Sequence, residues 1–451
     1  MKRLAVLLLP LFLALATAPA QEAGFDLQAA AGYSATDAGE FSASGKLKGW
    51  FRLPLSSSAR FSGSGYLQVG TIPAGSSAGV DAFKAAVDEL GFELAIKAPV
   101  EGMQGFSFDL GRFPFEDPTG QIVSTPADGL GFGFHYPNLI FSFRAGYTGF
   151  LFRETSDVAM SLADAGRAAS TEVLGPARFL GLASLELPPL FGQRIGLSFL
   201  AQEDLNPESA FVQAGAQVYE PGKGGPLDTQ YFTLRARGPI AAGLRYEAFA
   251  VYGTGRILSW LDDAASPSGH SYRFAPIQSG LFGLSLALPL ESFLPQATVG
   301  LKVLVATGDK EASSATEGNT QAVFHRFTPV TSSSLGLVYS PSLANLAFVE
   351  ASLGARPDFL PGRFQAAAKL MTFLRTTAGP VSEAGLDPAS TSAYLGTELD
   401  LVASYGIYSD LGLLLTLGAF LPGVAPAGAF STAYAGSHLQ FAARLAVTLA
   451  L

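Results

Sequence analysis

Any chemistry in this sequence has to come from histidines, hydroxyls and carboxylates, because the chain has no cysteine. That absence excludes disulfides, thiolate metal sites and cysteine nucleophiles. The four histidines, His135, His270, His325 and His438, stand far apart, and none has a metal-ligand spacing. No Ser/His pair stands at neighbouring strand ends, and no strand-to-helix nucleophile elbow is predicted. We therefore expect a protein that is not an enzyme, with no catalytic residues, no metal and no cofactor.

Charged side chains instead recur at every second position of segments that are otherwise apolar. Lys46, Lys48 and Arg52 alternate with apolar residues such as Leu47 and Phe51. A period of two places the two sets on opposite faces of a β-strand. If such strands close into a barrel with the apolar faces outward, the charged side chains line its interior.

Twelve basic and six acidic residues share this polar parity. The whole chain carries 28 basic and 37 acidic residues, so most of the acid must lie in loops and turns. A basic interior favours anions over cations, whereas cross-strand ion pairs would cancel part of the excess. The basic set is Lys46, Lys48, Arg52, Lys97, Arg144, Arg194, Arg235, Arg237, Arg245, Lys302, Lys369 and Arg444, and the acidic set is Glu93, Asp109, Glu186, Glu247, Glu398 and Asp400.

We expect residues of these two sets to line the path of a solute through the barrel. A further arginine, Arg112, has the parity of the apolar face, so a bulge or a strand end must turn it inward. If the loop that follows it folds into the barrel, Arg112, Glu116 and Asp117 form a constriction. The alternative is a surface loop with an ordinary salt bridge. The expected path is lined by Lys46, Lys48, Arg52, Lys97, Arg112, Arg144, Arg235, Arg237, Arg245, Glu398 and Asp400.

The alternation that positions these residues is clearest in the last stretch of the chain. From Ser437 to Leu451, apolar residues occupy every odd position after the first, and His438, Gln440, Arg444 and Thr448 stand between them. Ten further segments show the same pattern, and several approach the roughly 9–11 residues that a tilted strand needs to cross a bilayer. The sequence therefore predicts an all-β fold, a transmembrane antiparallel β-barrel of about 18 strands.

The connections between these segments come in two sizes, which is typical of outer-membrane barrels. Short ones carry Pro, Gly, Asn or Ser, while long ones, such as 253–276 and 308–330, are rich in Gly, Ala and Ser. Between Gly308 and Arg375 the up-and-down order does not close cleanly. An extra strand at 321–330 or a different pairing of 346–375 would resolve it, so 16 and 20 strands are the alternatives.

Composition and the N-terminus indicate an exported membrane protein. Mean hydropathy is +0.30, yet no stretch after residue 20 is a spanning helix. Lys2 and Arg3, an apolar run and Ala18-Pro19-Ala20 predict a signal peptide over 1–20, cleaved near Ala20. A retained membrane anchor is the alternative, although the run is shorter than the roughly 20 residues of a spanning helix. We expect a single barrel domain over 21–451, with a net charge of 26 − 37 = −11 after cleavage.

Two stretches resemble the alginate-export family of outer-membrane porins, a relative of the substrate-specific eighteen-stranded porins. The first is 110–120, a Gly-Arg strand that leads into a Gly/Asp loop. The second is 395–423, with Gly-x-Glu-Leu-Asp-Leu, a tyrosine before the turn and a Phe-x-Pro-Gly exit. The resemblance implies a barrel that exports an anionic polysaccharide through a pore lined by arginine and lysine. The chain departs from the family at Leu451, where an aromatic residue is expected, and at Phe113, where glutamine is common.

These observations predict a bacterial outer-membrane channel for passive passage of polar, anionic solutes or saccharides. Its expected partners are outer-membrane lipid, these solutes and the barrel-assembly machinery, which would bind the C-terminal strand. Nucleic acid is excluded by the acidic balance. The alternatives are a surface adhesin or structural barrel with a closed interior, and a fatty-acid-type transporter of apolar molecules. The transporter would need an N-terminal plug, for which only about four residues remain before the first strand.

Overall fold

The computed structural model describes residues 22–35, 40–70, 83–161, 164, 173–206, 212–220, 224–241, 243–290, 296–311, 323–357, 363–434 and 438–451. The predicted signal peptide lies outside the described residues. In the described part of the chain, no helix is long and apolar enough to cross a membrane.

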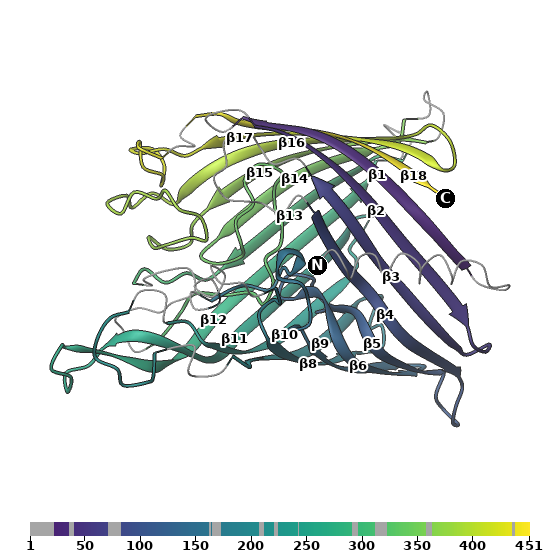
Figure 1. Cartoon of the computed structure of the whole chain (residues 1–451), viewed down its shortest axis with the longest axis horizontal. Helices are drawn as coiled ribbons and strands as arrows, with labels where there is room; N and C mark the ends of the chain where they lie inside the picture. Colours follow the sequence, from purple (N-terminus) through teal and green to yellow (C-terminus); the bar gives the residue numbers. More distant parts are fainter. Residues whose placement is uncertain are drawn as a thin grey trace.

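Eighteen antiparallel strands form one closed barrel, seen from the side in Figure 1. Each strand pairs with the next along the chain, and β18 pairs back onto β1, so that Gln28 lies opposite Thr448. The prediction of about 18 strands is confirmed, and the alternatives of 16 and 20 are wrong. The strands are β1 (Glu22–Ala35), β2 (Glu40–Pro54), β3 (Ala59–Gly70), β4 (Phe83–Lys97), β5 (Gly105–Glu116), β6 (Ser124–Tyr136), β7 (Leu139–Tyr147), β8 (Arg178–Glu186), β9 (Arg194–Asp204), β10 (Leu227–Pro239), β11 (Arg245–Asp262), β12 (His270–Pro289), β13 (Thr298–Ala306), β14 (Ala347–Ala355), β15 (Phe364–Leu374), β16 (Tyr394–Gly406), β17 (Leu411–Pro422) and β18 (Gln440–Ala450).

The barrel turns its apolar side chains outward. Phe232 and Leu234 of β10 are 49% and 52% exposed, whereas Tyr231 and Thr233 between them are buried at 1% and 5%. A bilayer core offers no hydrogen bonds, so the outward face must be hydrocarbon and every backbone group must pair within the sheet. The inward face is free to carry polar side chains.

One sequence prediction about the connections is wrong. The stretch 253–276, expected as a loop, is mostly strand, because β11 and β12 pair as far as Asp262 opposite His270. Of the two ways to close the up-and-down order, the extra strand at 321–330 is not formed over its described residues, 323–330, where Phe324 makes only an isolated bridge to Ile277. The order closes because β13 pairs directly with β14.

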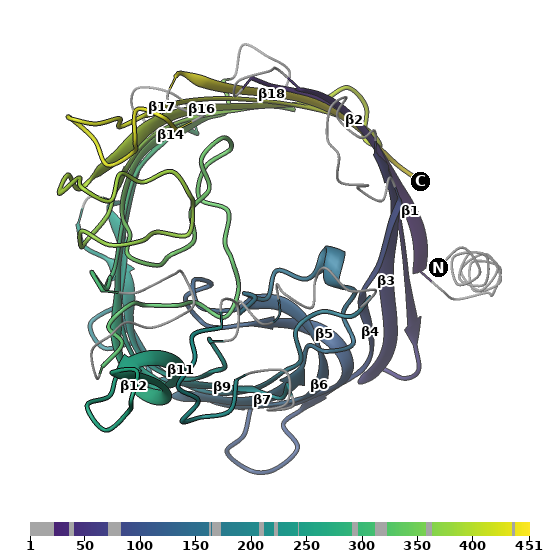
Figure 2. The ribbon, with the colours of Figure 1, turned by 60° about the vertical axis from the view of Figure 1, so that its left-hand side comes forward.

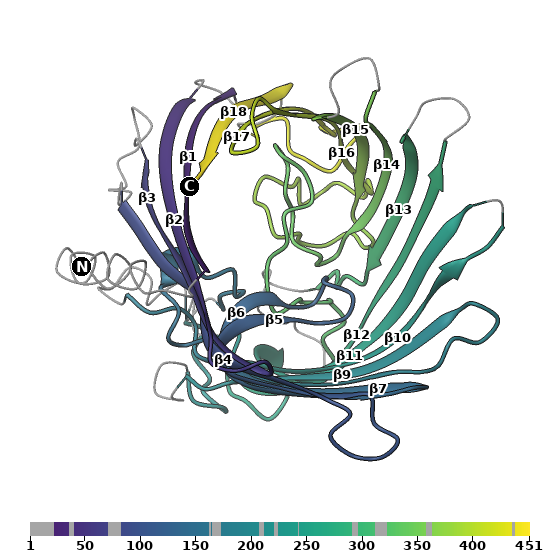
Figure 3. The ribbon, with the colours of Figure 1, turned by 90° about the vertical axis from the view of Figure 1, so that its right-hand side faces the viewer.

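The β5–β6 hairpin leaves the barrel wall halfway along its length. Its pairing with β4 ends at Arg112, and its pairing with β7 ends at Asp128. Beyond these points the two strands pair only with each other, and Figures 2 and 3 show them bending into the interior. Glycine permits the bend: Gly111 has φ +121, and a Cβ on Gly129 would lie 1.9 Å from the carbonyl oxygen of Ala145.

The hairpin tip and two long loops are joined by backbone hydrogen bonds inside the barrel. The amide of Val330 donates to the carbonyl of Ile122 at 2.8 Å, and the amide of Ala159 donates to the carbonyl of Val330 at 2.8 Å. Their apolar side chains pack on inward-facing residues of the wall, including Leu180 and Leu200. The largest hydrophobic core of the described residues therefore lies within the barrel, between the inward loops and one side of the wall.

An arginine on the lipid-facing side should destabilise the barrel. Leu234 lies near the middle of β10 and faces outward. The substitution Leu234→Arg should lower the free energy of unfolding by about 2–4 kcal/mol, the cost of a basic side chain near the bilayer midplane. Urea unfolding in phospholipid vesicles, followed by the far-ultraviolet circular dichroism of the sheet, measures this difference.

The matched control places the same side chain on the inward face. Ser44 lies on the polar side of β2 and is half-buried, so Ser44→Arg should change the unfolding free energy by less than about 1 kcal/mol. Equal losses for the two variants would contradict the assignment of the outward face.

Candidate functional site

The barrel interior has a covered side and an uncovered side. In Figure 2 the described inward loops gather over the wall around β5 to β14. Inward residues there, such as Leu182 and Phe249, are buried. On the opposite side, Lys48 and Arg52 of β2 keep side-chain exposures of 42% and 59%, and Arg444 of β18 is exposed. The uncovered wall, formed by β18, β1 and β2, is therefore the candidate surface for a solute.

Basic side chains on the uncovered wall are held by weak contacts. The Nζ atom of Lys46 lies 3.7 Å from the centre of the Tyr66 ring, and that of Lys48 lies 4.0 Å from a carboxylate oxygen of Asp88. Arg444 lies opposite Gly32, a residue without a side chain. A cation over an aromatic face is still reachable for an anion, since the ring carries no negative charge that would compete with it. Lys46 and Arg444 are therefore the strongest candidates for contact with an anion.

The inward face also carries carboxylates that the sequence count left out. Asp26 of β1 lies opposite Lys48, Glu89 accepts a hydrogen bond from Ser62, and Glu350 pairs with Lys369 at 3.8 Å. The segment that contains Asp26 is rich in alanine, so its alternation is weak in the sequence. The interior therefore has a smaller excess of basic over acidic residues than the count of twelve basic and six acidic residues suggests. The remaining excess lies where no carboxylate is close to the basic side chain.

Other expected path residues lie on the covered side or at strand ends. Arg144 of β7 lies across Gly131 from Asp109. Lys97 is the last residue of β4. Arg235, Arg237 and Arg245 gather near one end of β10 and β11, where Arg235 binds Glu247 with two hydrogen bonds of 3.1 and 2.9 Å. These residues do not form one continuous row with Lys46 and Lys48.

Arg112 lies at the point where the β5–β6 hairpin leaves the wall. Its guanidinium binds both carboxylate oxygens of Asp128, at 2.9 and 2.6 Å, and donates to the backbone carbonyls of Val87 and Phe150 at 3.2 Å each. The pairing of β5 with β6 runs through Arg112 without a register shift, so of the two alternatives the bulge is not formed, while the pairing of β5 with β4 does end at Arg112. These four bonds link the bent hairpin to β4 and to the loop after β7, which indicates a positioning role for Arg112.

Asp117, expected beside Arg112 at a constriction, has a different environment. Its carboxylate is buried and accepts hydrogen bonds from the amides of Thr119, Ile122 and Val123, at 2.8, 2.9 and 2.9 Å. These bonds fold the tip of the hairpin into a tight turn. Glu116, next to it, is exposed. Asp117 therefore shapes the loop, while only Glu116 offers its charge to solvent.

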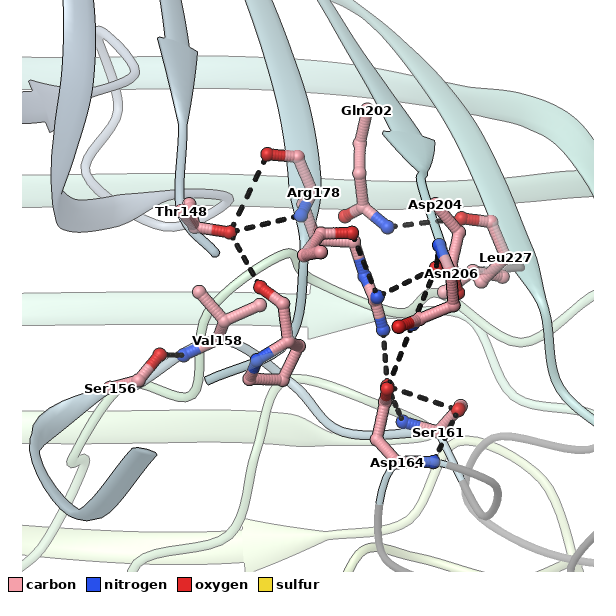
Figure 4. A network of polar contacts seen from close by, with 12 residues as sticks. Thr148, Ser156, Val158, Ser161, Asp164, Arg178, Gln202, Asp204, Asn206 and Leu227 are labelled. Carbon is pink, nitrogen blue, oxygen red and sulfur yellow. Dashed lines mark hydrogen bonds and ion pairs between the residues drawn. The ribbon is translucent and has the colours of Figure 1, made fainter. Parts of the chain in front are cut away.

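A buried ionic network ties the loop between β7 and β8 to the wall, as Figure 4 shows. Arg178 donates to Asp204 at 2.8 Å and forms a short ion pair with Asp164, and the side chains of all three are nearly inaccessible. Thr148 closes the base of the same loop by donating to the carbonyl of Pro176 at 2.8 Å. Burial alone would raise the pKa of Asp164, but the charge of Arg178 and the bonds from Ser161 outweigh it and lower that pKa.

Glu398 and Asp400, predicted to line the path, instead hold the loop between β13 and β14. Glu398 is 0% exposed and accepts the amides of Val338 and Tyr339, each at 2.8 Å. Asp400 accepts the amide of Leu337 at 3.3 Å. The Tyr339 ring stacks on Phe420 of β17 with centroids 4.5 Å apart. We call residues 335–340, held in this way, the latched loop.

The histidines stay on separate elements. His135 lies in β6 and His270 begins β12, while His325 and His438 lie outside the strands. Within the described ranges, no group of three or more His, Asp or Glu residues is placed to hold a metal ion.

The fold is that of an eighteen-stranded outer-membrane barrel, and comparison with solved structures shows the same. The chain is similar to OccK11 (OpdR) of Pseudomonas aeruginosa, with 13% identity, 96% of each chain covered and a TM-score of 0.53. It is also similar to OccK8 (OprE) of that organism, with 12% identity, 96% of this chain and 98% of the other covered, and a TM-score of 0.56. For the outer-membrane protein OpdK, also from P. aeruginosa, the identity is 13%, the coverages are 95% and 99%, and the TM-score is 0.52.

Other comparisons found no match. No family model matches the chain, and no curated protein matches it in sequence. The likeness therefore concerns the shape of the barrel, and the function has to be argued from the residues of this chain.

The Arg178 network predicts how the β7–β8 loop responds to substitution and to pH. Arg178→Gln leaves two buried carboxylates without their cation, which should cost about 3–5 kcal/mol and release the loop. Because the pKa of Asp164 is lowered in the folded protein, its stabilisation is present above its ordinary value of 3.8 and is lost as the pH falls through the folded value. Amide hydrogen exchange of residues 148–161 in micelles, corrected for intrinsic rates, measures both effects.

The contribution of Asp164 to the protection of this loop should therefore be lost only in strong acid, as the pH falls through its lowered pKa. The control is Arg52→Gln, which breaks the exposed pair with Glu22, 3.9 Å apart, and should cost less than about 1 kcal/mol. Protection that stays unchanged in strong acid would show that Asp164 does not carry the tether.

The latched loop predicts a change in conductance. Glu398→Gln replaces one of two acceptor oxygens by an amide NH2 group, which leaves one buried amide of Val338 or Tyr339 unbonded at a cost of about 1–3 kcal/mol. We expect added current fluctuations in single-channel recordings as the loop leaves the wall. Glu350→Gln is the control, because Glu350 binds Lys369 and none of the described loops. Similar fluctuations in both variants would contradict the latch.

Proposed function

We propose that this protein is a passive outer-membrane channel for polar solutes that prefers anions. The observation that carries the proposal is the placement of Lys46 and Arg444 on the uncovered wall, where neither forms a close ion pair among the described residues. A wall of this kind lowers the energy of an anion that passes along it and raises that of a cation. The closed barrel of eighteen strands supplies the route across the bilayer.

Passage would proceed by exchange of weak contacts. An anion that leaves water loses part of its hydration shell, and the ammonium of Lys46 and the guanidinium of Arg444 replace it. Lys48 contributes less, because Asp88 and Asp26 lie beside it. Each contact is exposed and weak, so a solute can leave the wall as readily as it enters. Conduction requires such weak binding, because a tightly bound solute would block the channel. The latched loop and the β5–β6 hairpin narrow the route from the other side.

The narrower hypothesis is an anionic polysaccharide as the solute, which the resemblance to the alginate-export family implies. Its support here is that Arg444 lies on β18 and Lys46, Lys48 and Arg52 lie on β2, the two strands that flank β1, so successive carboxylates of an extended chain could meet successive cations. Export through a signal peptide cleaved near Ala20 and assembly through β18 belong to the same proposal. The short turns would then lie on the periplasmic side.

A closed structural or adhesive barrel is the second candidate. The observation in its favour is the set of backbone hydrogen bonds that joins the hairpin tip, the β7–β8 loop and the β13–β14 loop across the interior. If these loops left no passage for ions, the barrel would present its long loops to a partner and conduct nothing. Conductance separates the two candidates.

The test is the current through single refolded channels in a planar bilayer under a KCl gradient. We expect conductance with a reversal potential of the sign for chloride. The double variant Lys46→Gln with Arg444→Gln should lower the ratio of chloride to potassium permeability by about twofold or more, because it removes two cations of the uncovered wall that form no close ion pair among the described residues. Arg363→Gln is the control, since Arg363 donates to the carbonyl of Ile407 at 3.2 Å and lies outside the uncovered wall.

Two results would overturn the proposal. A reversal potential of the sign for potassium would show that the inward carboxylates control permeation. Correctly folded protein without any conductance would leave the closed barrel as the function.

A further inference from the structure

Two arginines lie directly opposite each other on the inward face of neighbouring strands. Arg194 begins β9 and is paired in register with Arg237 of β10. Like charges in this position destabilise a sheet unless an anion lies between them. Here one carboxylate serves both: Glu186 of β8 accepts from Arg194 at 3.3 Å and from Arg237 at 3.0 Å.

The charge around this pair does not balance. A third arginine, Arg235, is bound through two hydrogen bonds to Glu247, so three guanidinium groups share two carboxylates. Arg245 begins the next strand and has no ion pair among the described residues. The cluster therefore carries an excess of positive charge near the end of the barrel that has the short turns.

Unused donors remain on these arginines. A guanidinium has five N–H donors, and Arg194 and Arg237 each show one hydrogen bond to Glu186. Their side chains are 54% and 37% exposed, so the other N–H groups are open to the interior. Arginine donors in this planar fork match the two oxygens of a carboxylate or a phosphate.

A small cavity lies beside these donors. Its volume is about 110 Å³, and it is lined by Glu186, Arg194, Gly196, Ser198, Thr233, Arg235 and Arg237, with Pro118 of the bent hairpin also at its edge. Gly196 stands opposite both Glu186 and Arg235 in the sheet, so no side chain fills the space between them. The cavity has room for a carboxylate or a phosphate group beside the arginine donors.

We propose that Arg194, Arg235 and Arg237 form a binding site for the oxyanion group of a solute, a carboxylate or a phosphate. The site rests on the proposed channel function, because the solute has to reach it through the barrel. The site differs from the uncovered wall because its three arginines lie close together and can bind one anionic group at the same time. The planar arginine donors favour groups with two or more oxygens, such as a carboxylate or a phosphate. The hairpin tip at Pro118 limits what can accompany that group.

The test measures binding separately from conduction. The probes are inorganic phosphate and acetate, added to refolded wild-type protein in micelles, with 31P line broadening for phosphate and calorimetry for both. We expect saturable binding of at least one probe, and we expect Arg237→Gln to weaken it by about tenfold or more. Arg363→Gln, which removes the same charge outside both this site and the uncovered wall, should leave the affinity within about twofold.

A second variant leaves the charges in place. Gly196→Val fills the cavity, since an added Cβ meets no atom closer than 3.8 Å and the backbone needs no change. It should abolish phosphate or acetate binding, and the KCl reversal potential should keep the sign of the wild type.

The outcomes separate this inference from the channel proposal. No saturable binding by a conducting, chloride-selective wild type would overturn the site and leave the channel intact. Equal affinity in wild type and Gly196→Val would also overturn it, because the anion would then be an adventitious ion only. Absence of conductance in folded protein would instead overturn the channel proposal, on which the site depends.

Discussion

The structure depends on one constraint, the pairing of every backbone amide and carbonyl in a medium that offers no hydrogen bonds. Only a closed sheet meets it with strands, and β18 meets β1 over ten register positions, from Asp26 opposite Ala450 to Ala35 opposite Phe441. Closure fixes the orientation of every side chain, because alternate residues must face lipid or the interior. The charged residues of the interior follow from this arrangement and need no separate scaffold.

The interior of the barrel is narrowed by segments that fold inward from the wall. Two glycines let the β5–β6 hairpin leave the wall, and Arg112 fixes it at the point of departure. Apolar residues that face inward, such as Leu180 and Tyr231, are then covered by loops and form a core. Away from the described loops, the wall formed by β18, β1 and β2 keeps exposed basic side chains. The same inward bend that narrows the barrel thus separates a packed side from a wet side.

The sequence predicted the parts of the fold that lipid imposes. The outward alternation around Phe232 and Leu234 is visible in the chain because lipid tolerates nothing else there, and it led to the strand number. The reach of β11 and β12 was missed, because their outer halves lie where Gly, Ser and Pro suggest a loop. The roles of Glu398 and Arg178 were missed for another reason. The parity of Glu398 pointed inward, but its partners come from a loop 60 positions away, which no local pattern reveals.

Distance along the chain also has a consequence for assembly. The amide of Ser124 is bonded to the hydroxyl of Thr331, 207 residues later, and this bond joins the β5–β6 hairpin to the loop between β13 and β14 beside the interior core. Contacts of such sequence separation form late, since the loop-closure entropy must be met before they contribute. The interior core therefore cannot fold separately from the barrel. It packs only after β5 and β14 have become part of the same closed sheet, so a packed core is evidence that the barrel has closed.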